Sequence, residues 1–214
     1  MYKNLEKGRS MIEMLGVLAI IGVLSVGGIA GYSKAMEKWK INKMLDEYSM
    51  MIQGILEHRE EFYKQSHNIE TYSLYIAETL QALNIIPANW QKNGNYLNDS
   101  VGNDVSVVIA PASQGMPDRI AIDIFLGGIY EDTYTEGFSV KVCTSLFTDL
   151  IIPLQNSIWK ATVLRNYNRL KSWVGSAYCT KNENCLSNMT LKDIHELCSY
   201  CDGKTANCDI DFNL

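Results

Sequence analysis

The chain has 214 residues, with 19 lysines and arginines against 24 aspartates and glutamates, so its formal net charge is −5. This length allows one substantial hydrophobic core, or one domain together with an anchor. The acidic balance argues against a general phosphate-binding surface, so nucleic acid is not an expected partner.

An apolar run is the first element in chain order. Met14 to Ser33 contains no charged residue, and at ~1.5 Å rise per residue a helix of this length spans about 30 Å, the hydrocarbon thickness of a bilayer. We therefore predict a transmembrane helix. The competing interpretation is a cleaved secretory signal, because Lys3 and Lys7 form a small basic region before the run. A signal has a short apolar segment, whereas this one is full length and continues into the charged residues that begin at Lys34.

Helical periodicity continues beyond the apolar run. Apolar residues recur at steps of three and four while charged residues mostly fill the other face, as in an amphipathic helix. The stripe consists of Met36, Trp39, Ile41, Met44, Leu45, Tyr48, Met51, Ile52, Ile55 and Leu56. No proline precedes Pro87. We therefore predict one helix from about Ser10 to about Phe62, whose second half packs against a globular core.

Five glycines interrupt the apolar half of this helix: Gly16, Gly22, Gly27, Gly28 and Gly31. Each costs up to ~1 kcal/mol relative to alanine in an exposed helix interior. Small residues let membrane helices approach closely, which predicts a helix–helix interface; the alternative is simple tolerance, since glycine is common in membrane helices. The dense cluster Gly27, Gly28 and Gly31 is where we expect the helix to loosen first.

Beyond this helix the sequence predicts a short helix and several strands. The helix lies between Ile69 and Trp90 and ends at Pro87, and turn residues gather from Lys92 to Asp104. The predicted strands are Val105 to Ile109, Arg119 to Leu126, Gly137 to Val142 and Asp209 to Leu214, with a loop from Pro111 to Pro117, a helical turn from Cys143 to Leu150 and an ambiguous segment from Trp159 to Leu164. Short connections favour an antiparallel sheet. The predicted fold class is α+β, with the long helix packed across the sheet.

All six cysteines lie in the last third of the chain: Cys143, Cys179, Cys185, Cys198, Cys201 and Cys208. In an oxidising compartment such a set indicates a disulfide framework, whose connectivity the sequence leaves open. The alternative is zinc, because Cys198-x-x-Cys201 has knuckle spacing and Cys179 with Cys185 could complete a tetrahedron. The wider spacing of that second pair and the lack of a histidine at ligand spacing favour disulfides, which places the C-terminal region outside the cytoplasm. Charge does not set the orientation, since basic residues flank the apolar run on both sides.

Catalytic motifs are missing from the sequence. It contains no nucleophile elbow, glycine-rich phosphate loop or paired-histidine metal motif, so we do not expect an enzyme. His195 lies among carboxylates in a segment that we interpret as a solvated helix turn. Asp202, Asn207, Asp209 and Asp211 offer oxygen ligands for calcium, but their spacing is not that of a known calcium loop, and we expect a charged C-terminal edge.

Glu13 stands at the start of the apolar segment, where an unpaired carboxylate costs ~2.5–3.5 kcal/mol on insertion scales. No cation of the same chain reaches it within the run, so its partner must come from another molecule. The segment Gly8-Arg9-Ser10-Met11-Ile12-Glu13, followed by apolar residues to Ser25, resembles the N-terminus of type IV prepilins. In that family a short basic leader ends in glycine, a glutamate stands fifth after it, and a long apolar helix follows.

The resemblance implies cleavage between Gly8 and Arg9 by a membrane prepilin peptidase. Residues 1–8 would then be a leader, 9–34 the transmembrane and assembly half of the helix, and 35–214 a globular pilin domain made of 35–65, 66–142 and the cysteine-rich 143–214. Removal of two lysines and one glutamate changes the formal charge from −5 to −6. The new α-amino group, often methylated in the family, would meet Glu13 of a neighbouring subunit. Here Arg9 replaces the family's usual hydrophobic residue, and the glycine cluster replaces its helix-loosening proline.

A looser likeness extends along the chain. Ile86-Pro87, the loop around Gly102, the strand from Val105, the segment at Cys143 and a closing strand with Phe212 follow the order found in pilins with a cysteine-closed C-terminal region. In such pilins one disulfide ties that region. The resemblance therefore implies a pair between Cys143 and a cysteine near the end, such as Cys208, with the other four pairing among themselves.

The function that the resemblance implies is that of a structural subunit without cofactors. The precursor would cross the inner membrane once, with its C-terminal domain in the periplasm, and would polymerise with copies of itself into an extracellular pilus. A prepilin peptidase, an assembly ATPase and a platform protein would be its partners. The alternatives are a pseudopilin of a type II secretion system, whose major subunit usually lacks a disulfide and binds calcium, and a membrane-tethered enzyme or sensor that holds zinc. Adhesion, DNA uptake, motility and secretion all remain open as uses of the filament.

Overall fold

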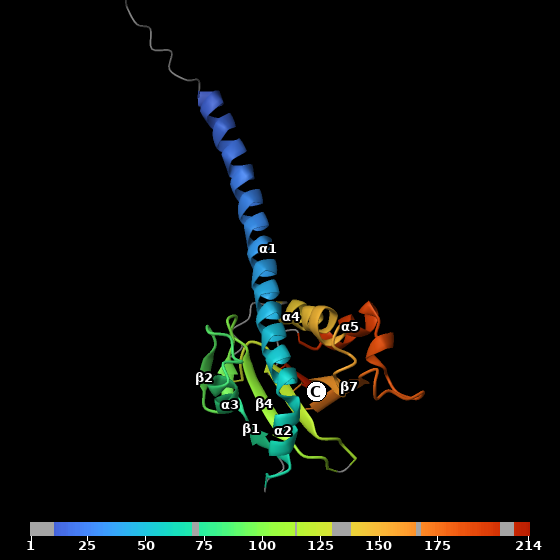
Figure 1. Ribbon diagram of the computed structural model, residues 1–214. Helices are drawn as coiled ribbons and strands as arrows, with labels where there is room; N and C mark the ends of the chain where they lie inside the picture. The colour runs from blue at the N-terminus through green and yellow to red at the C-terminus, as the bar shows by residue number, and fades with distance from the viewer. Residues whose placement is uncertain (1–10, 70–72, 114, 130–137, 166–167, 202–207) are drawn as a thin grey trace, which may run out of the picture. The chain divides into compact units, whose positions relative to one another are not determined.

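The computed structural model describes residues 11–69, 73–113, 115–129, 138–165, 168–201 and 208–214 (Figure 1). The chain forms two compact units, 1–40 and Ile41–Leu214, which are considered separately. Helix α1 (Met11–Glu57) contributes residues to both. It confirms the predicted N-terminal helix, including the amphipathic half.

The long helix ends earlier than predicted, at Glu57 instead of Phe62. The backbone at His58 leaves helical values, with φ −106° and ψ 15°, and its N–H bonds three residues back to the Ile55 carbonyl at 3.2 Å. A second helix, α2 (Arg59–Ser66), then begins. The break lets α2 bury its own residues, Phe62 and Ser66, against the sheet.

The remaining elements alternate between short helices and strands. They are β1 (Leu74–Tyr75), α3 (Ala77–Ala82), β2 (Gln91–Asn93), β3 (Tyr96–Asn98), β4 (Asp104–Ala110), β5 (Arg119–Phe125), α4 (Phe138–Leu146), the π-helical turn η1 (Phe147–Ile151), β6 (Lys160–Arg165), β7 (Asn168–Val174), the 3₁₀ turn η2 (Leu186–Asn188), α5 (Leu191–Cys198) and β8 (Cys208–Asn213). The strands predicted from Val105, Arg119 and Asp209 are confirmed. The ambiguous segment from Trp159 is strand β6.

The prediction that Gly137 to Val142 extends the sheet is wrong. Gly137 lies outside the described residues, and Phe138 begins helix α4. Its buried residues include Phe138, Val142, Cys143 and Leu146. Steps of four, one and three keep these side chains on one helical face, and their burial outweighs the β-propensity of the valines.

One antiparallel sheet organises the second unit (Figure 1). Its strand order is β2-β3-β4-β5-β8-β6-β7, and β1 pairs with β4 outside this path. The last strand of the chain therefore lies between β5 and β6, paired with both. This position ties the C-terminal residues to the middle of the sheet.

The core lies between one face of the sheet and the second half of α1. Val107, Ile122, Phe212 and Ala161 are in register across β4, β5, β8 and β6, and all four are fully buried. The buried residues of α1 that join the same core are Ile41, Met44, Leu45, Tyr48, Met51, Ile52 and Ile55. Each large apolar side chain buried in this way contributes ~1.5–3 kcal/mol. Burial from Ile41 to Ile55 confirms that this part of the stripe packs on a globular core, whereas Trp39, which was predicted to belong to the stripe, is 55% exposed.

Candidate functional site

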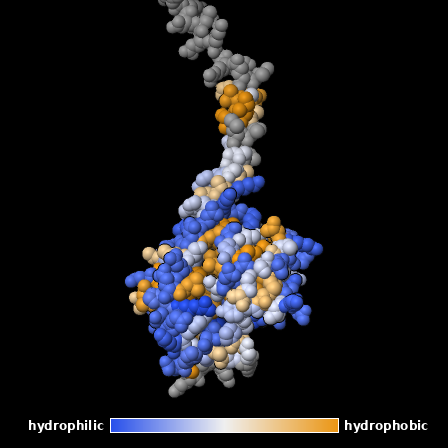
Figure 2. Space-filling view, turned by 45° about the vertical axis from the view of Figure 1, so that its right-hand side comes forward, coloured by the Kyte–Doolittle hydropathy of each residue, from blue (hydrophilic) through white to orange (hydrophobic). Residues whose placement is uncertain are grey.

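The first half of α1 exposes its apolar side chains wherever they are described. Its large side chains are between 52% and 70% exposed at Met14, Leu15, Val17, Leu18, Ile20, Ile21, Ile29 and Tyr32. Figure 2 shows hydrophobic residues gathered on this part of the helix. Exposed apolar patches of this extent mark membrane or protein contacts. Among the described residues, one helix is long and apolar enough to cross a membrane, and it is α1. None of its most apolar stretch is buried.

Among the described residues, the glycines of this half pack against no other part of the chain. A Cβ built on Gly16, Gly22, Gly27, Gly28 or Gly31 would meet no atom within 4 Å. Gly54 differs, because a Cβ there would lie 2.8 Å from Cγ2 of Ile85. Gly8 and Arg9 lie outside the described residues, as does the side chain of Glu13. The described residues of the chain therefore supply no packing reason for the first five glycines.

A buried glutamate joins α1 to the segment between α3 and β4. Glu47 is 7% exposed and accepts hydrogen bonds from Asn89 Nδ2 at 2.8 Å, Trp90 Nε1 at 2.9 Å and Ser100 Oγ at 2.6 Å. Burial alone would raise its pKa, but these donors, with Lys43 at 3.7 Å, hold the pKa of Glu47 below its ordinary value. Glu47 is therefore a charged anchor for this connection.

Asp99 organises the neighbouring turn. Its Oδ1 accepts the backbone N–H groups of residues 101, 102 and 103 at 2.8–2.9 Å, while its Oδ2 accepts from Tyr48 at 2.9 Å and from the Asn103 amide at 2.6 Å. Gly102 adopts φ +100°, which favours glycine. Burial nevertheless raises the pKa of Asp99 above its ordinary value. Tyr48 and Glu47 thus bind this segment from adjacent positions on α1.

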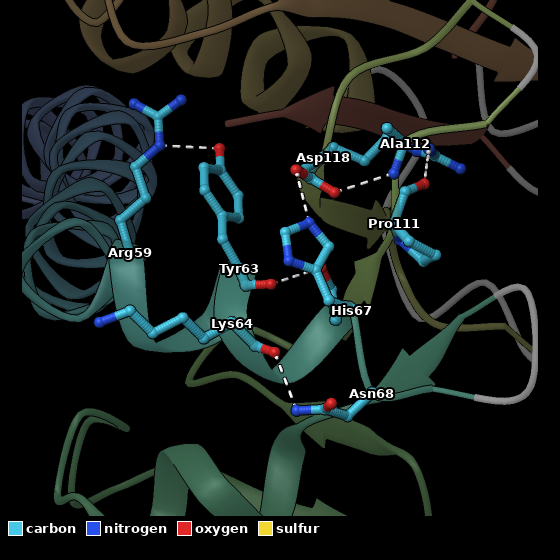
Figure 3. Close-up of polar contacts among 10 residues, drawn as sticks. Arg59, Tyr63, Lys64, His67, Asn68, Pro111, Ala112 and Asp118 are labelled. Atoms are coloured by element: carbon cyan, nitrogen blue, oxygen red, sulfur yellow. Dashed lines mark hydrogen bonds and ion pairs between the residues drawn. The ribbon is translucent and has the colours of Figure 1, made fainter.

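Helix α2 is held by polar contacts at Tyr63, in its middle, and at His67, just after its last turn (Figure 3). Arg59 Nε donates to the Tyr63 hydroxyl at 2.7 Å, and that hydroxyl donates to the carbonyl of Leu214 at 3.0 Å. Farther along, His67 Nε2 lies 3.0 Å from Asp118 Oδ2, and Asp118 Oδ1 accepts the Ala112 N–H at 2.8 Å. These contacts hold α2 to the chain terminus and to the loop between β4 and β5.

The six cysteines form three disulfides, which confirms the predicted framework. The pairs are Cys143–Cys198, Cys179–Cys185 and Cys201–Cys208. The implied pair between Cys143 and Cys208 is wrong. Helix α5 packs on α4 and brings Cys198 to Cys143, both fully buried, while Cys208 at the start of β8 meets Cys201. The four sulfurs of the zinc alternative are therefore in disulfides, and none is a thiolate ligand in this structure.

A polar row crosses the sheet on the face opposite the hydrophobic row. Ser106, Asp123, Asp211, Thr162 and Ser172 are in register on β4, β5, β8, β6 and β7. Arg169 donates to Asp211 at 3.0 Å and Ser106 donates to Asp123 at 2.9 Å. The row is thus held by hydrogen bonds and one ion pair.

Three carboxyl groups of this face have raised pKa values. Burial, with the charge of Asp211, raises the pKa of Asp123 to about 6. Burial, with the charges of Asp123 and Asp211, raises that of Asp209 to about 9, and burial raises that of Asp211 as well. The side chains of Asp209 and Asp211 are buried, so they do not form the charged edge that we expected. Asp202 and Asn207 lie outside the described residues. In the described part of the chain, no group of three or more histidine, cysteine or acidic side chains is placed to hold a metal ion.

The sequence analysis did not identify the buried carboxylates, although the position of one of them, Glu47, could have indicated its burial. Glu47 falls on the apolar stripe between Met44 and Tyr48, and a glutamate at such a position is rarely fully buried unless paired. Asp193 and His195 lie on α5, which confirms the predicted helical turn, and Asp193 closes a capping box with Thr190.

Comparison of the chain with protein-family models, with curated proteins and with solved structures found no match.

Proposed function

We propose that the chain is a structural subunit of a type IV pilus, processed by a prepilin peptidase and polymerised through its N-terminal helix. The observation that carries the proposal is the division of α1. One helix, Met11–Glu57, is apolar and exposed over its first half, while its second half supplies the core of an α+β unit. An apolar helix surface of this size is unfavourable in contact with water, so we expect lipid or another protein to cover it.

The N-terminal sequence supports the proposal that the apolar surface of the helix is covered first by lipid and later by other subunits. Gly8, Arg9 and Glu13 match the prepilin pattern. The precursor would lie in the inner membrane with the disulfide-bonded unit in the periplasm, and the helix would later move from lipid into a bundle of identical helices. Because lipid and a helix bundle are both apolar, such a transfer leaves the apolar side chains covered throughout.

The role proposed for Glu13 follows from its charge. Once the leader is removed, the α-amino group at Arg9 is a cation beside the apolar segment. A carboxylate of one subunit and this cation of the next would form a charge-assisted hydrogen bond, worth ~1.5–3 kcal/mol. This pairing would also set the axial register of neighbouring subunits.

The three disulfides favour a pilus subunit over a secretion pseudopilin. Two of them, Cys143–Cys198 and Cys201–Cys208, are buried in the C-terminal region, where they link α4 to α5 and the segment after α5 to β8. A filament exposed outside the cell gains from covalent links that constrain the unfolded chain.

Intact mass, measured without reductant on protein from membranes of cells that contain a prepilin peptidase, tests this proposal. We expect the loss of residues 1–8 and a mass two hydrogens lighter for each disulfide. The Gly8→Leu variant, expressed in the same cells, should retain the leader. A full-length wild-type chain, or a processed Gly8→Leu chain, would contradict the cleavage assignment. Electron microscopy of sheared cells then tests for filaments that contain the processed chain.

A further inference from the structure

The segment that follows the apolar run carries positive charge on an otherwise acidic chain. Residues 34–40 include Lys34, Glu37, Lys38 and Lys40, so three positive charges and one negative charge give a local net charge of +2. The whole chain is −5, so the remaining residues sum to −7. All three lysines are exposed on α1. We call residues 32–40, with Tyr32 and Trp39, the basic collar.

Two aromatic side chains lie in the same short stretch. Tyr32 is 68% exposed and Trp39 is 55% exposed. They are seven residues apart, so they lie on nearly the same face of the helix, about 10 Å apart along its axis. Tyrosine and tryptophan with this exposure are typical of the membrane–water interface, where an apolar ring meets the polar headgroups.

The height of the collar matches the headgroup layer. The uncharged run ends at Ser33, and the lysines follow within seven residues, or about 10 Å of helix rise. The polar layer on each side of the hydrocarbon is roughly 5–8 Å thick. Lysine side chains reach several ångströms along the helix while their aliphatic stems stay on apolar surface. The ammonium groups therefore lie at the depth of the phosphates when the apolar run fills the hydrocarbon.

We propose that the basic collar binds the headgroups of anionic phospholipids in the leaflet that faces the C-terminal unit. The collar attracts anionic headgroups by charge, since residues 34–40 have a net charge of +2 while the remaining residues sum to −7. This inference rests on the membrane-anchor part of the proposed function and not on polymerisation. It adds a lipid preference, which would hold the subunit in the membrane until its helix is withdrawn.

Lipid retention by the full chain tests the proposal. The chain is purified in detergent, mixed with equal amounts of phosphatidylglycerol and phosphatidylcholine of matched acyl chains, and examined by native mass spectrometry. One lysine near an anionic surface is worth about fivefold in an equilibrium constant, or ~1 kcal/mol. We expect the wild-type chain to retain phosphatidylglycerol at least about fivefold more than phosphatidylcholine.

Two triple variants make the test specific. Lys34→Gln, Lys38→Gln and Lys40→Gln together should bring the retention ratio close to one. The matched variant, Lys64→Gln, Lys141→Gln and Lys181→Gln, changes three exposed lysines of the other unit and should keep the wild-type ratio. A wild-type ratio near one, or a high ratio that the collar variant keeps, would overturn the proposal.

The membrane anchor is checked separately by flotation of the full chain with vesicles. A chain that does not float with vesicles would contradict the anchor and this inference together. A floating chain that forms no filaments would contradict polymerisation alone.

Discussion

Asp123 on β5 and Asp211 on β8 occupy directly opposite positions in the sheet, and Asp209 lies two residues before Asp211 on the same face. Arg169 is hydrogen-bonded to Asp211, while Lys160 and Arg119 lie near enough to favour its charge. Asp209 Oδ1 is buried without a hydrogen-bond partner among the described residues. Among the described residues, these three carboxyl groups, with Asp209 and Asp211 buried and Asp123 half-buried, thus have one hydrogen-bonded cation, which explains why their pKa values rise.

Stability should fall as the pH rises from about 4 to about 9. In this window the folded chain keeps a proton on Asp209, whose pKa is about 9, and below pH 6 also on Asp123, while the unfolded chain releases both near the ordinary value of 3.8. The folded state binds more protons, so the free energy of unfolding decreases with pH. Asp209→Asn should increase it on the order of 1 kcal/mol at pH 8 and flatten the profile.

Urea unfolding at several pH values measures this effect. The exposed Asp46→Asn variant is the control and should follow the wild-type profile. An Asp209→Asn variant with the same pH dependence as wild type would show that this carboxyl group does not hold the proton.

Glu47→Ala should destabilise the second unit by about 2–4 kcal/mol, because it leaves the donors of Asn89, Trp90 and Ser100 without their acceptor. The lowered pKa of Glu47 gives stability that is present above its ordinary value of 4.5 and is lost as the pH falls below it. The difference between wild type and Glu47→Ala should therefore shrink in acid. Thermal unfolding at pH 7 and pH 3 tests both statements, and equal stability of the two chains at pH 7 would refute the anchoring role.

The disulfides should differ in their contribution to stability. Cys143–Cys198 joins residues 55 apart and Cys179–Cys185 joins residues 6 apart. The loop-entropy relation gives about 4 kcal/mol for the first and about 2 kcal/mol for the second. Cys143→Ser with Cys198→Ser should lower the free energy of unfolding more than Cys179→Ser with Cys185→Ser. Denaturant titration compares the two, and the reverse order would argue against the buried pair as the main constraint.

A large side chain in place of a glycine should affect filament assembly at one position of α1 and folding stability at another. Gly28→Leu meets open space within the chain and should leave the thermal midpoint of the second unit unchanged, while reducing filament yield if helices pack at this position. Gly54→Leu is the control that should affect folding. Its Cβ would clash with Ile85, and the strain should lower the free energy of unfolding by ~1–3 kcal/mol. Normal filaments from Gly28→Leu would assign that glycine to tolerance and not to an interface.

Glu13→Ala should keep membrane insertion and reduce filament yield by at least about tenfold, since a charge-assisted hydrogen bond contributes ~1.5–3 kcal/mol. Flotation with membranes measures insertion, and electron microscopy of sheared filaments measures assembly. Glu37→Ala, on the same helix beyond the apolar run, should assemble normally. Wild-type filament yield from Glu13→Ala would exclude the neighbour pairing.

Local sequence patterns predicted the elements with strong periodicity. The apolar run, the stripe from Ile41 to Ile55, and the alternation at Val105, Arg119 and Asp209 each place side chains through the geometry of their own helix or strand. The α+β class followed from these patterns, and the presence of C-terminal disulfides followed from the six cysteines gathered in the last third of the chain. A segment whose pattern fits both a helix and a strand could not be assigned from sequence. Phe138 to Leu146 is a helix because its apolar face is buried there.

The tertiary structure alone decided which distant segments meet. Strand β8 pairs with β5 and β6, and α5 brings Cys198 to Cys143, so neither the sheet order nor this long-range disulfide was visible in local spacing. The burial of Glu47 and Asp211 likewise depends on donors and strands from elsewhere in the chain. The physical reason is that periodicity reports the neighbours of a residue along the chain. Pairing, burial and pKa depend on its neighbours in space.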